Sequence, residues 1–230
     1  MIHFPFSFTD RSMNTTPWFH RGGLHSGGIT PTLYAGGTVI IQRKFQPEKT
    51  LDMVQQYGLT FLIGVPNVLE LLAEAQQKQP RDLSSLRGIV TMGSPLERAD
   101  CIRYQKILTK RIFNGYGTTE TFWNTFLRPD DLPEMAGSAG RSCVDDDVRV
   151  IKVYEDRVAE PDDLAATDGS EVEKLSFAPM PSRRRSISAT LRKPAGGSTT
   201  AFSIPMIWYM GREPLFPHCR TERRYDHFRR

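Results

Sequence analysis

The segment 111–120, which reads RIFNGYGTTE, combines small, aromatic, hydroxyl and acidic residues in an order that suits nucleotide chemistry. Gly115 and Gly117 allow a ligand to approach the backbone closely, and the ring of Tyr116 between them offers a face on which a base can stack. The two hydroxyls that follow can donate to a phosphate, and the final carboxylate can hold a hard divalent cation. A second interpretation stays open: a glycine-rich turn followed by a helix that Thr118 caps.

The elements that must position this segment alternate between strand and helix patterns from about residue 33 to residue 117. Apolar runs predict strands at 38–41, 60–65, 86–92 and 111–113, the first of them buried. Amphipathic spacing predicts helices at 46–58, 68–80 and 96–108. Strands without polar alternation are typical of a parallel sheet with helices on both faces, so the predicted fold class is α/β, mostly parallel.

Three glycine-containing loops follow the predicted strands. They are Gly64-Val65-Pro66, Gly93-Ser94-Pro95 and Gly115-Tyr116-Gly117. Ligands of open parallel sheets bind beyond the carboxyl ends of the strands. We therefore expect the three loops on one rim, where together they indicate a binding site more strongly than any one of them alone.

The pattern changes after residue 135, and we expect three regions. These are an α/β subdomain at 1–135, the start of a small β subdomain at 136–172, and a basic tail at 173–230. Alternating apolar and polar residues at 148–154 predict a half-exposed antiparallel strand. The tail is rich in Arg, Pro and Ser and lacks periodicity, so we expect it to be disordered or poorly packed.

The net charge of +4 comes from the tail of this 230-residue chain. Residues 1–172 carry 18 Lys/Arg and 22 Asp/Glu, whereas residues 173–230 carry 12 and 4. Nucleic-acid binding by the whole chain is therefore not expected. The tail clusters around Arg183–Arg185 and Arg223-Arg224 remain an alternative phosphate-binding element, although a solvated run is the preferred interpretation.

Several classes of protein are disfavoured by what the sequence does not contain. It has no run of 18 apolar residues, so no membrane span is expected, and residues 1–6 do not form a convincing signal peptide. Cys101, Cys143 and Cys219 form neither a disulfide framework nor a zinc pattern. Their spacing fits a reducing compartment, so the expected localisation is cytoplasmic.

Six motifs follow one another between about residues 13 and 172. They are Pro17-Trp18-Phe19-His20; Gly36-Gly37 with Phe45-Gln46-Pro47; Phe61–Pro66; Asp82–Arg87 with Gly93-Ser94-Pro95-Leu96; Asn114–Glu120; and Gly137–Arg141. In this order they resemble the middle of the AMP-forming acyl-CoA synthetases, the adenylate-forming ligases that include luciferases and peptide-synthetase adenylation domains. The resemblance implies a partial large N-terminal domain of such an enzyme, incomplete at its N-terminus.

The resemblance implies a two-step reaction, in which a carboxylic acid attacks the α-phosphate of ATP and coenzyme A then displaces AMP. It implies catalytic roles for Thr119, Glu120 and His20, with Glu120 also a Mg²⁺ ligand. It implies cofactor binding by Gly93, Ser94, Pro95, Asn114, Gly115, Tyr116, Gly117 and Thr118. Tyr116 would stack on adenine, and the glycines at 115 and 117 would leave space for the acyl group. The alternative for His20 is a histidine at the edge of the core, bonded to backbone.

Motifs that this family has elsewhere are absent from the sequence. These are the phosphate loop Thr-Ser-Gly-Thr-Thr-Gly-x-Pro-Lys-Gly, the Tyr-x-Thr-Gly-Asp motif whose aspartate binds ribose, and the lysine of the C-terminal domain. We therefore expect a ligase fragment that is inactive alone. The alternative is a non-catalytic module that binds adenine nucleotide or a partner chain.

The abrupt loss of pattern near Glu173 leads to the hypothesis of a reading-frame change there. Loss of the preceding part of the domain should expose apolar surface from Leu24 to Tyr34, so we expect poor solubility. The sequence indicates neither the particular acid nor the oligomeric state.

Overall fold

The computed structural model describes residues 4–119, 121–144, 146–154, 156–157, 159–160 and 162–165, and the backbone of three further strands at 173–179, 187–190 and 208–210. The chain divides into two units, Met1–Val144 and Asp145–Arg230. Each unit has its own sheet. None of the described helices is long and apolar enough to cross a membrane.

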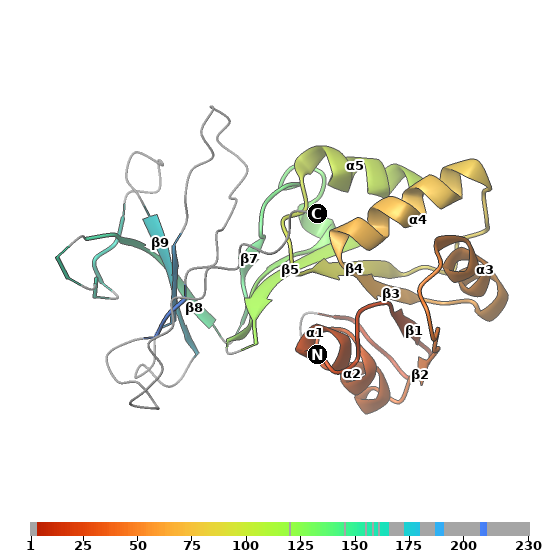
Figure 1. The fold of residues 1–230 in the computed structure, drawn as a ribbon, viewed down its shortest axis with the longest axis horizontal. Helices are drawn as coiled ribbons and strands as arrows, with labels where there is room; N and C mark the ends of the chain where they lie inside the picture. Colours follow the sequence, from red (N-terminus) through yellow and green to blue (C-terminus); the bar gives the residue numbers. More distant parts are fainter. Residues whose placement is uncertain are drawn as a thin grey trace. The chain divides into compact units, whose positions relative to one another are not determined.

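The sheet of the first unit has seven strands in the order β2-β1-β3-β4-β5-β6-β7 (Figure 1). The strands are β1 (Arg11–Asn14), β2 (Thr38–Val39), β3 (Phe61–Gly64), β4 (Gly88–Met92), β5 (Ile112–Thr118), β6 (Phe122–Leu127) and β7 (Arg141–Ser142). Pairing is parallel from β2 through β5 and antiparallel from β5 to β7. The predicted α/β class with a mostly parallel sheet is confirmed.

Helices lie on both faces of this sheet. They are α1 (Arg21–Leu24), α2 (Ile29–Tyr34), α3 (Pro47–Tyr57), α4 (Pro66–Lys78) and α5 (Arg98–Ile107), with a short 3₁₀ turn η1 (Pro129–Asp131). Figure 1 shows α3, α4 and α5 on one side of the strands and α1 and α2 on the other. This two-sided cover is what a parallel sheet requires.

The helix ends follow from local sequence signals. Pro47 and Pro66 occupy the first turns of α3 and α4, where a missing N–H costs nothing. Gly58 ends α3 in the left-handed region with φ of 58°, a conformation that glycine adopts without strain. These boundaries confirm the helices predicted around residues 46–58 and 68–80.

Two apolar clusters separate along the strands because successive side chains point to opposite faces. Ile89 and Ile112 join the cluster that packs against α3, α4 and α5. Val90 and Phe113 join an aromatic cluster on the opposite face, together with Phe61. The face to which each strand residue points is thereby fixed along β4 and β5.

The strand expected to be buried at 38–41 is instead a two-residue edge strand, and that expectation is wrong. Thr38 is exposed and β2 pairs only with β1. The sequence analysis did not predict β1, because three of its four residues are polar or charged. Ser12 lies 2.7 Å from the hydroxyl of Thr32 in α2, so hydrogen bonding replaces apolar packing on that face. Farther along, Leu33 and Tyr34 are exposed, at 57% and 80%, as the sequence analysis expected.

The second unit contains a four-stranded antiparallel sheet in the order β11-β10-β9-β8. Its strands are β8 (Asp146–Lys152), β9 (Glu173–Pro179), β10 (Ile187–Thr190) and β11 (Trp208–Met210). Strand β8 overlaps the antiparallel strand predicted at 148–154. The other three lie in the segment expected to lack structure, and β9 pairs with β8 along its whole length. The remainder of 173–230 lies outside the described residues.

A buried carboxylate connects the start of the first unit to β4. The side chain of Asp10 is fully buried and accepts hydrogen bonds from the backbone N–H of Ser7 at 2.7 Å and from Nη1 of Arg87 at 2.7 Å. Burial alone would raise the pKa of Asp10, but hydrogen bonds from Thr60, Ser7 and Arg87 outweigh it and lower the pKa below 3.8.

We predict that Asp10→Asn lowers the free energy of unfolding at pH 7 by about 2 kcal/mol, because an amide cannot accept the same charged hydrogen bonds. Since the folded-state pKa lies below the unfolded value, this contribution is complete above about pH 4 and is lost as the pH falls through the folded pKa. Urea unfolding at pH 7 and pH 3 measures both effects. The exposed Glu74→Gln serves as the control. An equal difference in the free energy of unfolding between wild type and Asp10→Asn at both pH values would contradict the lowered pKa of Asp10.

Candidate functional site

The carboxyl ends of β1, β3 and β4 lie together at one edge of the first unit's sheet. The hydroxyl of Thr15, directly after β1, donates to the carbonyl oxygen of Ile63 at 2.9 Å. A Cβ on Gly64 would lie 2.7 Å from that hydroxyl oxygen, and a Cβ on Gly93 would lie 3.6 Å from the side chain of Val65. The loops after β3 and β4 are therefore neighbours, as the sequence analysis expected.

The loop after β4 presents its backbone at the surface. Gly93, Ser94 and Pro95 are exposed, while Leu96 beneath them is buried. Gly93 has φ of +87°, in the left-handed region that favours glycine.

The short helix α1 brings His20 to the same edge. The ring of His20 is exposed, and its Nδ1 accepts a hydrogen bond from the backbone N–H of Gly22 at 3.0 Å. Because Nδ1 accepts this bond, the proton of a neutral imidazole lies on Nε2. A Cβ on Gly22 would lie 3.3 Å from the sulfur of Met92, the last residue of β4. The backbone bond expected in the alternative interpretation of His20 is present, and it leaves Nε2 available.

Asn14 holds α1 in place, a role that the sequence analysis missed. Its side chain is buried at the end of β1. The amide nitrogen donates to the carbonyl oxygens of Gly22 at 3.2 Å and Gly23 at 3.1 Å, and Oδ1 accepts from the backbone of Thr16 at 2.8 Å. The one sequence feature that could have indicated this role is the polar side chain of Asn14 at the end of a short strand.

The segment around Tyr116 is a strand, and its expected placement in a loop is wrong. Strand β5 continues from Ile112 to Thr118 and pairs antiparallel with β6, with a register shift between Tyr116 and Gly117. The alternative of a helix capped by Thr118 is also wrong, because Thr118 ends a strand. The glycines concealed this continuation, since glycine lowers strand propensity.

The two glycines permit close contacts within this hairpin. A Cβ on Gly115 would lie 1.9 Å from the indole ring of Trp123, and a Cβ on Gly117 would lie 1.8 Å from the carbonyl oxygen of Phe122. The space beside each glycine is therefore filled by β6. The two glycines therefore allow the close packing of β5 against β6. The family resemblance implied instead that they leave space for the acyl group.

The turn between β5 and β6 is closed by hydroxyl groups. The hydroxyl oxygens of Thr118 and Thr121 lie 2.7 Å apart, and the Thr121 hydroxyl donates to Oδ1 of Asn124 at 2.6 Å. Thr118 is buried and engaged in the turn, whereas Thr119 is exposed. Glu120, the predicted Mg²⁺ ligand, lies outside the described residues.

Buried polar groups lie on the same sheet face as Tyr116. The register pairs Asn114 with Thr91 and Tyr116 with Thr125, so all four side chains point toward the face covered by α3, α4 and α5. Within the described part of the chain, Oδ1 of Asn114 and the hydroxyls of Thr91 and Thr125 are buried without a hydrogen-bond partner. Buried polar groups normally have partners, so their clustering here is unusual. Burial also raises the pKa of the Tyr116 phenol.

No group of three or more His, Cys, Asp or Glu side chains that could hold a metal ion occurs among the residues that the structure describes. Burial raises the pKa of the Cys101 thiol to about 11, so this residue is not a thiolate near neutral pH.

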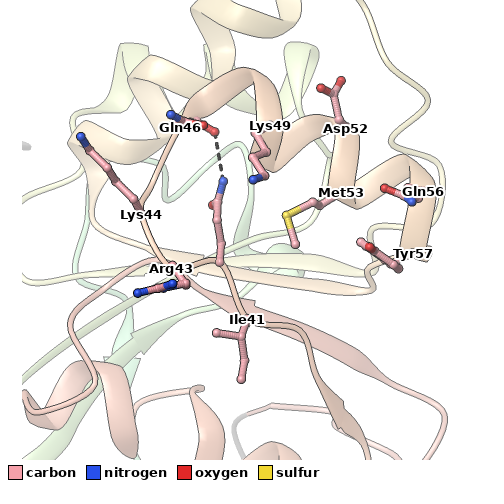
Figure 2. A pocket seen from close by; sticks show the side chains of 10 residues that line it. Ile41, Arg43, Lys44, Gln46, Lys49, Asp52, Met53, Gln56 and Tyr57 are labelled. Atoms are coloured by element: carbon pink, nitrogen blue, oxygen red, sulfur yellow. Dashed lines mark hydrogen bonds between the residues drawn. The ribbon is translucent and has the colours of Figure 1, made fainter.

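A separate groove of about 590 Å³ runs along α3 (Figure 2). Its lining consists of Ile41, Gln42, Arg43, Lys44, Gln46, Lys49, Asp52, Met53, Gln56 and Tyr57. None of the predicted site residues lines it. Asp52, its one carboxylate, is paired with Arg81 at 2.9 Å, so the rim of the groove is cationic.

The family to which this chain belongs follows from its match to known proteins. The family model described as AMP-binding enzyme matches residues 1–192, and the chain is a member of that family. Indoleacetate–CoA ligase from Aromatoleum aromaticum is 36% identical over 146 residues, which cover 63% of this chain and 28% of that protein. Feruloyl-CoA synthase from Amycolatopsis sp. is 33% identical over 144 residues, covering 61% and 28%. The chain thus spans about 28% of the length of these relatives.

Solved structures share the fold. A malonyl-CoA ligase, in a ternary product complex with methylmalonyl-CoA and AMP, matches with a TM-score of 0.64 and 27% identity over 77% of this chain and 36% of that one. O-succinylbenzoate coenzyme A synthetase from Bacillus subtilis, in complex with ATP and magnesium ion, gives a TM-score of 0.61 at 22% identity, covering 76% and 34%. About three quarters of the chain therefore shares the architecture of these adenylate-forming enzymes.

We predict that Gly115→Ala destabilises the first unit by at least about 2 kcal/mol, because the rigid indole of Trp123 cannot move aside cheaply. The double variant Gly115→Ala with Trp123→Leu should cost less than the sum of its two single changes. Thermal and urea unfolding of the four proteins measure the coupling. A Cβ on Gly58 would meet no atom within 4 Å, so Gly58→Ala adds backbone strain without a steric contact. This variant should lower the free energy of unfolding by about 1 kcal/mol. Full additivity of the two changes would show that the contact is absent.

Proposed function

We propose that this chain carries the adenylate-binding part of an AMP-forming carboxylic acid–CoA ligase, with ATP or AMP, Mg²⁺ and coenzyme A as the ligands of the complete reaction. The observation that supports it most is the cluster of buried, unsatisfied oxygens at Asn114, Thr91 and Thr125 on the face of Tyr116. A bound adenine would supply a stacking partner for Tyr116 and hydrogen-bonding groups next to Asn114.

The other predicted residues have roles that agree with this arrangement. The exposed backbone of Gly93, Ser94 and Pro95 would border the base. The exposed Thr119 would donate to the α-phosphate, and Nε2 of His20 would face the acid. Magnesium, when bound through Glu120, would neutralise phosphate charge during adenylation. Gly115, Gly117 and Thr118 would contribute by shaping the hairpin that carries these groups.

The relatives are named for indoleacetate and ferulate, both carboxylic acids that are joined to coenzyme A. Because this chain spans about 28% of their length, its acid substrate and its complete activity are proposals. A second candidate function is adenine-nucleotide binding without catalysis. The absence of the phosphate loop from the sequence favours it for the chain tested alone.

We predict that Tyr116→Ala weakens AMP binding by about tenfold or more, because stacking of a base on an aromatic ring contributes roughly 1–3 kcal/mol. Tyr116→Phe keeps the ring and should bind AMP within about twofold of wild type. Isothermal titration calorimetry with AMP and Mg²⁺ measures the three affinities. Equal AMP affinity in Tyr116→Ala and wild type would refute adenine stacking at this position.

We also predict little or no ligase activity from the 230-residue chain alone, since the sequence holds no loop to grip the β- and γ-phosphates. Pyrophosphate release and thioester formation are measured with ATP, coenzyme A and a panel of acids that includes indoleacetate and ferulate. A catalytically competent ligase of the same family serves as the positive control. Turnover by this chain at a comparable rate would contradict the prediction and favour the complete enzymatic function.

A further inference from the structure

Arg21 connects α1 to the turn between β5 and β6. Its Nη1 donates a hydrogen bond to the carbonyl oxygen of Thr118, a residue 97 positions later in the chain. Its guanidinium carbon also lies 4.0 Å from the centroid of the Phe122 ring, which is cation–π geometry. One side chain therefore contacts Thr118, just before Thr119, and Phe122, the first residue of β6.

The turn that Arg21 contacts is strained. Phe122 has φ of +64°, which is a genuine outlier for a bulky residue, and its ring is 59% exposed. Such conformations persist only where the surroundings enforce them. Here the close approach of Gly117 to the Phe122 carbonyl and the hydroxyl contact between Thr118 and Thr121 act together with Arg21.

The helix α1, which carries Arg21, is itself held by hydrogen bonds. His20 precedes it and accepts from Gly22, so the first turn of α1 is capped. Asn14 then fixes the carbonyl oxygens of Gly22 and Gly23 from β1. The helix that carries Arg21 is therefore hydrogen-bonded to β1 on one side and capped at its first turn.

We propose that Arg21 is a positioning residue for the adenylation site, fixing the 118–122 turn relative to His20. The inference rests on the proposed function, in which Thr119 contacts the α-phosphate and His20 faces the acid. Displacing such groups by about 1 Å is enough to slow a reaction strongly, so a contact that joins the two elements affects affinity and rate. Arg21 thus adds to the residues that the family resemblance supplies.

The test compares Arg21→Ala and Arg21→Lys with the matched control Arg98→Ala. Arg98 also donates to backbone carbonyls, those of Glu134 at 2.8 Å and Ala136 at 3.2 Å, but in a different loop. Hydrogen–deuterium exchange of the amides at 118–123 reports the order of the turn without any ligand. Calorimetric titration with AMP and Mg²⁺ reports its effect on binding.

We expect Arg21→Ala to raise exchange at 118–123 by about tenfold and to weaken AMP binding by a similar factor, because a charged hydrogen bond is lost. Arg21→Lys should recover only part of both effects, since lysine lacks the planar fork that stacks on the ring. Arg98→Ala should change neither the exchange at 118–123 nor the AMP affinity, even if it lowers the melting temperature as much as Arg21→Ala does.

Unchanged exchange at 118–123 in both Arg21 variants would overturn the inference, as would an equal rise in Arg98→Ala. Failure of the wild-type chain to bind AMP would instead contradict the proposed function. Because exchange is measured without nucleotide, the two failures are distinguishable. A loss of AMP affinity in Arg98→Ala that matches Arg21→Ala would show general destabilisation and would also overturn the inference.

Discussion

Two close approaches that only glycine permits determine the geometry around the candidate site. Without side chains at Gly115 and Gly117, β6 can lie directly against β5, with Trp123 and Phe122 in the space that Cβ atoms would occupy. Strand β5 can therefore continue to Thr118 and turn back at once. Thr119 therefore follows directly after the last residue of β5.

The site combines two kinds of support. The exposed loop after β4 offers backbone groups, because Gly93 adopts a conformation that most residues avoid. The hairpin offers side chains whose facing direction is set by register, so that Asn114 and Tyr116 share a face with Thr91. Helix α1 is held to β1 by Asn14 and contacts the hairpin through Arg21. The contact between Arg21 and Thr118 joins residues 97 positions apart, whereas Asn14 contacts α1 from only eight or nine positions away.

The sequence alone predicts the apolar strands β3 and β4 and the helices that carry terminal signals, such as Pro47 and Gly58 around α3. It does not predict β1, because Ser12 and Asn14 hydrogen-bond to helices where a buried strand usually has apolar side chains. It also ends β5 too early, because the effect of glycine on a strand depends on what packs against it. Candidate residues with a characteristic local motif, such as Tyr116, are found from sequence. Asn14 and Arg21 are not, since their partners are known only after folding.

The change from parallel to antiparallel pairing at β5 has a further consequence. Parallel strands need a crossover, and here α4 and α5 supply it while covering the sheet. The tight return into β6 needs no crossover, so among the described residues the helical layer ends with α5 (Figure 1). Antiparallel strands tolerate one uncovered face. Beyond α5, the cover on this side of the sheet is the non-helical segment from Leu132 to Ala136, which packs against the same apolar cluster as α3, α4 and α5.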